Sequence, residues 1–187
     1  VAADVENDGD RDLFITGFGR NLLFLNRGDG SFEEVSRKTG VQGSGWATGA
    51  AFGDYNGDGF LDLYIARYVE FSVDDYPTGC LFSGIPVTCG PNRYRGSPDL
   101  LYRNNGDGTF SDVSAASGIR SGEAYNGLGV IFLDYDNDGL QDIYVANDAT
   151  PANLWKNNGD GTFSDQAVLA GCAFSGDGRE QARMGVD

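Results

Sequence analysis

Three short segments concentrate carboxylates at alternate positions, beginning at Asp4, Asp54 and Asp134. They read DVENDGDRD, DYNGDGFLD and DYDNDGLQD, and each has glycine at its sixth position. Oxygen ligands with this spacing can surround one hard cation, and the glycine permits the sharp turn that this requires. All-oxygen ligation favours calcium, because magnesium prefers fewer protein ligands and more water. Two or three calcium ions are therefore expected.

The expected ligands are the side chains at positions 1, 3, 5 and 9 and the backbone carbonyl at position 7, where the side chain varies freely. In chain order the candidates are Asp4, Glu6, Asp8, Asp10 and Asp12; Asp54, Asn56, Asp58, Phe60 and Asp62; and Asp134, Asp136, Asp138, Leu140 and Asp142. The loops are not EF-hands, since position 12 is Ile15, Ile65 or Val145 in place of a bidentate glutamate. The alternative is a set of Asp/Gly-rich turns capped by their own side chains. It stays most open for the first loop, where Glu6 is longer than aspartate.

The loops recur because the chain is a repeat. Each loop runs into a short apolar and aromatic segment, and a second block with Asn-x-Gly-Asp-Gly closes at Phe32, Phe110 and Phe163. The period is about 50 residues, as expected for four strands plus turns. The second repeat is longer, and its extra residues span about 69–98.

The repeat predicts an all-β fold of four-stranded antiparallel units and no helix. Strands are expected at 47–52 and 129–133 before the loops; at 13–16, 63–66 and 143–146 after them; at 22–26, 100–104 and 154–157; and at 32–36, 110–114 and 163–165. The Asn-x-Gly-Asp-Gly segment between the last two strands of each unit is a hairpin turn, where glycine supplies positive φ.

The insertion at about 69–98 holds four of the five prolines, together with Cys80 and Cys89. A long proline-rich excursion from a regular repeat is typical of a surface loop, and such loops often carry function. The short spacing predicts a Cys80–Cys89 disulfide, worth about 2.7 kcal/mol in the loop-entropy description; two free thiols are the alternative. Cys172 occupies the repeat position of Val41 and Ile119, so we expect a buried small apolar residue there.

The motifs DYDNDGLQDIY from Asp134 and LYRNNGDGTFSDVS from Leu101 resemble the FG-GAP/VCBS repeats of integrin α-chain propellers. They are more similar still to the cartilage acidic protein-like (ASPIC/UnbV-associated) family, as is the insertion's C-x8-C-G-P. The match covers nearly the whole chain. It implies a calcium-stabilised β-propeller that is extracellular, periplasmic or cell-surface, with no defined catalytic activity. Integrin-type ligand binding does not carry over, because no matching ligand-binding residues are present.

This resemblance divides the chain into about three blades of a larger propeller. The expected blades are residues 1–45, lacking a first strand; 46–121, with the insertion at about 69–98; and 122–175; residues 176–187 begin the next blade. Propellers typically have four to eight blades. The remaining blades or a partner chain are therefore expected at both ends.

Composition narrows the possible functions. The formal charge is −15, from 28 acidic and 13 basic residues, so a duplex nucleic-acid partner is not expected. The chain has no histidine, which excludes Ser-His-Asp catalysis and His-bound zinc or haem. No apolar run approaches the ~18 residues of a membrane span.

The leading hypothesis is a binding or scaffold module, not an enzyme, whose partner is a protein or a carbohydrate. Arg67, Tyr68, Arg93, Tyr94 and Arg95 could form its contact site, with a solvated loop surface as the alternative. One other hypothesis is a polysaccharide-active lyase or glycosidase, which would need two carboxylates about 5–10 Å apart outside the calcium loops. Another is a subunit of a larger assembly.

Overall fold

The computed structural model describes residues 1–74, 76–183 and 185–186, so Met184 and Asp187 of the expected last segment lie outside the described residues. Strands dominate the described part. They are β1 (Ala2–Ala3), β2 (Asp12–Ile15), β3 (Leu22–Asn26), β4 (Phe32–Glu34), β5 (Ala47–Gly53), β6 (Asp62–Arg67), β7 (Leu81–Phe82), β8 (Ile85–Pro86), β9 (Leu100–Asn104), β10 (Phe110–Asp112), β11 (Gly127–Leu133), β12 (Asp142–Thr150), β13 (Asn153–Asn157), β14 (Phe163–Asp165) and β15 (Gln181–Ala182). The predicted all-β class is confirmed.

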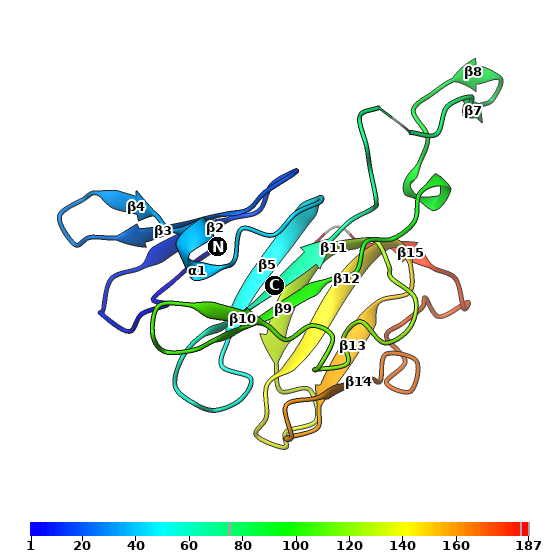
Figure 1. Ribbon diagram of the computed structural model, residues 1–187. Helices are drawn as coiled ribbons and strands as arrows, with labels where there is room; N and C mark the ends of the chain where they lie inside the picture. The colour runs from blue at the N-terminus through cyan, green and yellow to red at the C-terminus, as the bar shows by residue number, and fades with distance from the viewer. Residues whose placement is uncertain (75, 184, 187) are drawn as a thin grey trace.

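Three large antiparallel sheets follow one another along the chain, and β7 and β8 form a separate two-stranded sheet within the insertion. The first sheet has the order β1-β2-β3-β4, the second β5-β6-β9-β10 and the third β11-β12-β13-β14, with β15 paired to the end of β12. Figure 1 shows the three sheets side by side in chain order. In each sheet the acidic loop joins the first strand to the second, so all three loops lie at the same end of the sheets.

The first strands of the second and third sheets approach each other closely. The Thr48 hydroxyl of β5 donates to the Gly127 carbonyl of β11 at 2.7 Å. A Cβ at Gly49 would lie 2.5 Å from the Leu128 carbonyl oxygen, which is too close for any side chain. Glycine at this position therefore permits the sheets to pack at their inner edge.

The core lies between the sheets. Leu63 and Ile65 of β6 pack toward the first sheet, while Tyr64 and Ala66 pack toward the third. Successive side chains of a strand point to opposite faces. Residues 62–66 of the strand are all buried because both faces of the second sheet are covered.

Two short helical segments depart from the expectation of no helix, namely α1 (Ser36–Thr39) and η1 (Pro91–Arg93). The strand predicted at 32–36 ends at Glu34, where the Glu34 carboxylate accepts the Ser36 N–H at 2.9 Å. The Ser36 hydroxyl in turn accepts the Leu23 N–H at 2.7 Å. These side chain–backbone bonds replace the strand ladder and turn the chain into α1.

Candidate functional site

The acidic loops share one internal scaffold, seen clearly in the third. The Asp134 carboxylate accepts the N–H groups of Asp138 at 3.1 Å and Gly139 at 3.0 Å. The Asp138 carboxylate accepts the Leu140 N–H at 2.9 Å. Corresponding bonds occur in the other two loops, from Asp4 and Asp8 and from Asp54 and Asp58. The loop backbone is therefore held by the same side chains that were predicted to bind a cation.

The aspartate at position 9 has a different environment. Asp142 is fully buried, and its two oxygens accept the N–H groups of Tyr135 at 3.1 Å and Asn157 at 2.8 Å. Asp12 and Asp62 make the corresponding pairs of bonds. Burial raises the pKa of Asp62 to about 7. These three residues tie each loop to the third strand of its own sheet, and a ligand role for them stays a prediction.

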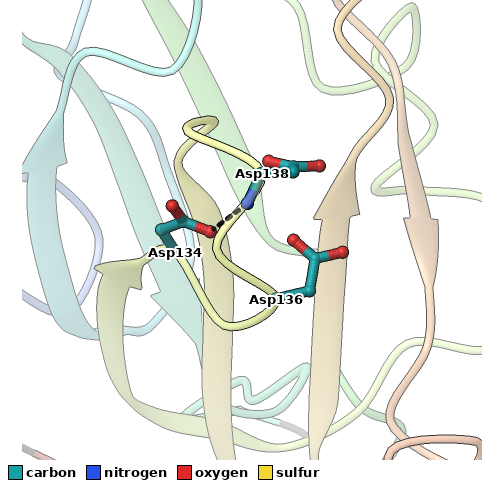
Figure 2. A group of neighbouring side chains, drawn as sticks. All are labelled: Asp134, Asp136 and Asp138. Carbon is teal, nitrogen blue, oxygen red and sulfur yellow. Dashed lines mark hydrogen bonds between the residues drawn. The ribbon is translucent and has the colours of Figure 1, made fainter.

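The third loop brings three carboxylates together. One oxygen from each of Asp134, Asp136 and Asp138 lies within 4.8 Å of the others, and in the part of the chain that the structure describes no other such group of acidic, cysteine or histidine residues occurs. Figure 2 shows these side chains on the loop, with the Asp138 N–H bonded to the Asp134 carboxylate. All three are exposed. A hard cation prefers this kind of donor set, and the Leu140 carbonyl could complete it.

The other two loops differ in their third position. In the second loop the Asn56 amide donates to the Asp58 carboxylate at 2.8 Å, so an amide replaces one of the three charges. In the first loop desolvation raises the pKa of Glu6, and a hydrogen bond with Asp8 and repulsion from Asp12 and Asp8 raise it further. The candidate ligands of all three loops remain predictions, and the third loop has the closest group of carboxylates among the described residues.

A basic residue beside the third loop was not predicted. The Lys156 ammonium on β13 donates to the carboxylates of Asp136 and Asp138, at 2.6 Å from the latter. These bonds raise the pKa of Lys156 and lower that of Asp138. The corresponding positions hold Leu25 and Arg103, so the sequence contained a basic residue at this point in two of three repeats. Only the strand register shows that the side chain reaches the loop.

The first and second loops also contact the following sheet. The side-chain amide of Asn104 in the second sheet donates to the Val5 carbonyl in the first loop at 2.8 Å. Asn157 in the third sheet makes the same bond to the Tyr55 carbonyl in the second loop, also at 2.8 Å. These two loops therefore lie at the junctions between sheets, where a bound ion would affect more than one hairpin.

The insertion leaves the opposite end of the sheets (Figure 1). The predicted Cys80–Cys89 disulfide is confirmed, with Cα atoms 5.2 Å apart, and Cys172 is free and partly buried against a small apolar cluster. Phe71 of the insertion packs on Trp46 with ring centroids 5.7 Å apart and on Tyr94 at 6.0 Å. An aromatic cluster thus anchors the insertion to the second sheet.

The five residues proposed as one contact site do not share one surface. Arg67 turns inward and donates to the Pro98 carbonyl at 3.2 Å, and the Tyr68 hydroxyl donates to Asp148 at 2.6 Å. Arg93 lines a separate hollow beside the disulfide, whereas Tyr94 and Arg95 line a larger pocket. Only these last two remain together at a concave site.

No helix in residues 1–74, 76–183 and 185–186 has the length and apolar character needed to cross a bilayer. The chain is similar to cartilage acidic protein 1 of Xenopus tropicalis, with 25% identity over 90% of this chain, and to that of Homo sapiens, with 24% identity over 83%. It spans about a third of the length of these relatives, 34% and 31% respectively.

Among solved structures, an Agrocybe aegerita lectin described as recognising non-reducing terminal N-acetylglucosamine aligns with 88% of this chain and 36% of its own. Its sequence identity is 20% and its TM-score 0.43. The FG-GAP-like repeat family matches residues 4–65, 87–145 and 134–182, which together cover most of the chain. The chain therefore belongs to the FG-GAP-like repeat family.

Proposed function

We propose that this chain is a calcium-stabilised, extracytoplasmic propeller segment that acts as a binding or scaffold module. The observation that carries the proposal is the cluster of Asp134, Asp136 and Asp138, whose carboxylate oxygens lie within 4.8 Å of one another. Like charges at this distance repel strongly unless a cation neutralises them. The Lys156 ammonium supplies one positive charge, which leaves the three carboxylates with a net negative charge. We propose two to three calcium ions, with the third loop as the strongest site.

The Cys80–Cys89 bond supports an extracellular, periplasmic or cell-surface location, because disulfides persist in oxidising compartments. The relatives fit a binding role better than an enzymatic one, since the name cartilage acidic protein 1 refers to no catalytic activity. Its partner would be a protein or a carbohydrate.

The exposed outer face of the first sheet is an argument that a neighbouring blade or a partner chain packs against it. Phe110 and Phe163 are 9% and 5% exposed because each packs against the preceding sheet, whereas the corresponding Phe32 is 51% exposed. Leu13 and Ile15 are also exposed, at 37% and 42%. We propose that a further blade or a partner chain covers this face, and that the blades divide at 1–45, 46–121, 122–175 and 176–187.

Calorimetric titration with calcium tests the proposal, together with melting curves with and without chelator. A site filled at ten times its dissociation constant adds about 1.4 kcal/mol of stability, and each 1 kcal/mol raises the melting temperature of a chain this size by about 2–4 °C. Asp136→Asn should weaken binding at the third loop about tenfold or more. Asp177→Asn, which changes an exposed carboxylate paired with Arg179, is the matched control. An absence of calcium binding at millimolar concentration to folded protein would contradict the proposal.

A further inference from the structure

A pocket of about 510 Å³ lies at the end of the sheets opposite the acidic loops. Three segments form most of its wall: residues 91–98 of the insertion, the loop at 122–126, and residues 149–151 at the end of β12. Glu70 and Glu180 complete the lining. The volume falls in the range of pockets that hold small ligands or a few residues of a peptide.

The pocket wall is held by hydrogen bonds from several elements. The Glu70 N–H donates to the Arg95 carbonyl at 2.8 Å, which closes the base of the insertion. The Asn126 amide donates to the Asp148 carbonyl at 3.0 Å. A Cβ at Gly96 would lie 2.1 Å from the Ala124 carbonyl oxygen, so the insertion and the loop at 122–126 are in direct contact. The site is therefore largely formed before any ligand arrives.

Backbone strain occurs at the same place. Ala149 has φ of 52°, a left-handed conformation that is uncommon for residues other than glycine. Such conformations persist where the surrounding structure fixes them, and they cluster at ligand sites.

The pocket is negatively charged. Glu70, Glu123 and Glu180 line it with one guanidinium, that of Arg95. None of the three glutamates forms an ion pair with the basic groups that the structure describes. They do not form a group close enough to share one metal ion, in contrast to the third acidic loop. Charge spread in this way suits an extended ligand that carries a positive group.

Aromatic and proline side chains supply a further part of the wall, beside small and amide residues. Tyr94 is held in place by its contact with Phe71, and Tyr125 lies beside Glu123. Burial raises the pKa of Tyr125, and the negative charge of Glu123 raises it further, so this phenol stays neutral. Tyrosine rings attract ammonium and guanidinium groups, and apolar walls suit the methylene stems of lysine and arginine.

A recess of about 40 Å³ adjoins the pocket and shares the residues Pro98, Gly122, Glu123, Ala124 and Tyr125 with it. Trp155 lines the recess and is 6% exposed, and its indole Nε1 has no hydrogen-bond partner among the described residues. The indole N–H faces the buried Tyr64 hydroxyl and is not open to the recess, so Trp155 contributes its ring to the wall.

We propose that this pocket binds a lysine- or arginine-bearing segment of a partner protein. The cationic head lies among Glu70, Glu123 and Glu180, and the stem lies against Tyr94 and the proline walls. This inference deepens the proposed binding function and rests on it, since it names the chemistry of the partner.

The test is calorimetric titration of the calcium-saturated chain with acetyl-Gly-Lys-Gly-amide and acetyl-Gly-Arg-Gly-amide. The norleucine analogue, acetyl-Gly-Nle-Gly-amide, keeps the stem without the charge, and butylamine keeps the charge without the peptide carbonyls. We expect the two basic peptides to bind about tenfold or more tightly than either control compound, and less tightly as salt increases.

A double variant, Glu123→Gln with Glu180→Gln, should weaken the basic peptides about tenfold. Glu33→Gln is the control, because it removes a carboxylate that pairs with Arg27 on the first sheet, far from the pocket. It should leave the affinity for the basic peptides unchanged. The proposal would be overturned if the norleucine peptide or butylamine bound as tightly as the basic peptides, or if the double variant bound the basic peptides unchanged. Binding of maltose or cellobiose in place of the peptides would also overturn it. Calcium titration of the same samples reports on the proposed function separately, because the acidic loops lie at the other end of the sheets.

Discussion

Two asparagines at the same position of their repeats should differ sharply in their importance for stability. The side chain of Asn157 is 1% exposed and donates to the Tyr55 carbonyl of the preceding loop at 2.8 Å and to the Gln141 carbonyl at 3.1 Å. Asn26 lacks a preceding sheet in the described structure, and its amide donates only to the exposed Arg11 carbonyl at 3.3 Å. Both side-chain oxygens accept an N–H in the following hairpin turn, so this bond cancels in the comparison.

The expected cost follows from the bond between sheets. In Asn157→Ala the Tyr55 carbonyl loses its buried side-chain donor, which costs about 1–3 kcal/mol, and the lost bond to Gln141 and the turn bond add about 1 kcal/mol. The total is about 2–4 kcal/mol. In Asn26→Ala the carbonyl of Arg11 can bind water, so about 1 kcal/mol or less is expected.

Urea unfolding followed by circular dichroism, at saturating calcium, measures both free energies of unfolding. Asn104→Ala gives an internal check, because its amide donates to the Val5 carbonyl at 2.8 Å and should behave like Asn157→Ala. If the Asn26 and Asn157 variants lose the same stability within about 0.5 kcal/mol, the bond between sheets contributes nothing measurable and the reasoning is refuted.

Three further predictions concern other parts of the chain. Gly96→Ala should lower the free energy of unfolding by about 1–3 kcal/mol, because its Cβ would collide with a backbone oxygen, whereas Gly90→Ala, with 3.5 Å to its nearest neighbour, should be neutral in the same urea assay. Burial raises the pKa of Asp99 from 3.8 to about 7, so the folded state retains a proton that the unfolded state loses. Asp99 should therefore make stability fall as pH rises from about 4 to about 7, by about 1–2 kcal/mol given the partial exposure of the side chain. Asp99→Asn should reduce the dependence, and the part that remains comes from Asp62, whose pKa burial also raises to about 7. Lys156→Met should raise the calcium affinity of the third loop about threefold to tenfold in calorimetry, since its ammonium bonds the same carboxylates; an unchanged affinity would contradict the assignment.

The sequence predicted strand positions best where turn chemistry determined both ends. The strands at 22–26, 100–104 and 163–165 have the predicted bounds, because the Asn-x-Gly-Asp-Gly turn specifies where the third strand stops and the fourth begins. The strand predicted at 143–146 instead continues to Thr150, where it pairs with β15. That pairing joins segments with no shared motif, so periodicity could not predict it.

The sequence predicted the clustering of the candidate side chains better than it predicted their surroundings. The clustering of Asp134, Asp136 and Asp138 follows from their alternate spacing in one tight turn. The contact of Lys156 with this cluster depends on how β13 aligns with β12, which is a property of the folded sheet. The pocket beside the insertion combines residues from three distant segments, so its charge and shape emerge only in the fold.

Hydrogen bonds between neighbouring sheets end on carbonyls of the acidic loops, so calcium binding to a loop should also stabilise the junction with the next sheet. The first loop accepts a bond from the second sheet and the second loop accepts one from the third, in both cases through a backbone carbonyl of the loop itself. An ion that ordered a loop would therefore position the carbonyl that the next sheet uses, and would stabilise the junction as well as its own hairpin. Removal of calcium should then lower the cooperativity of unfolding together with the melting temperature, because neighbouring sheets would lose a shared contact. Hydrogen exchange of the N–H groups in β9 and β13 with and without calcium would distinguish this from a purely local effect, which would leave those strands equally protected.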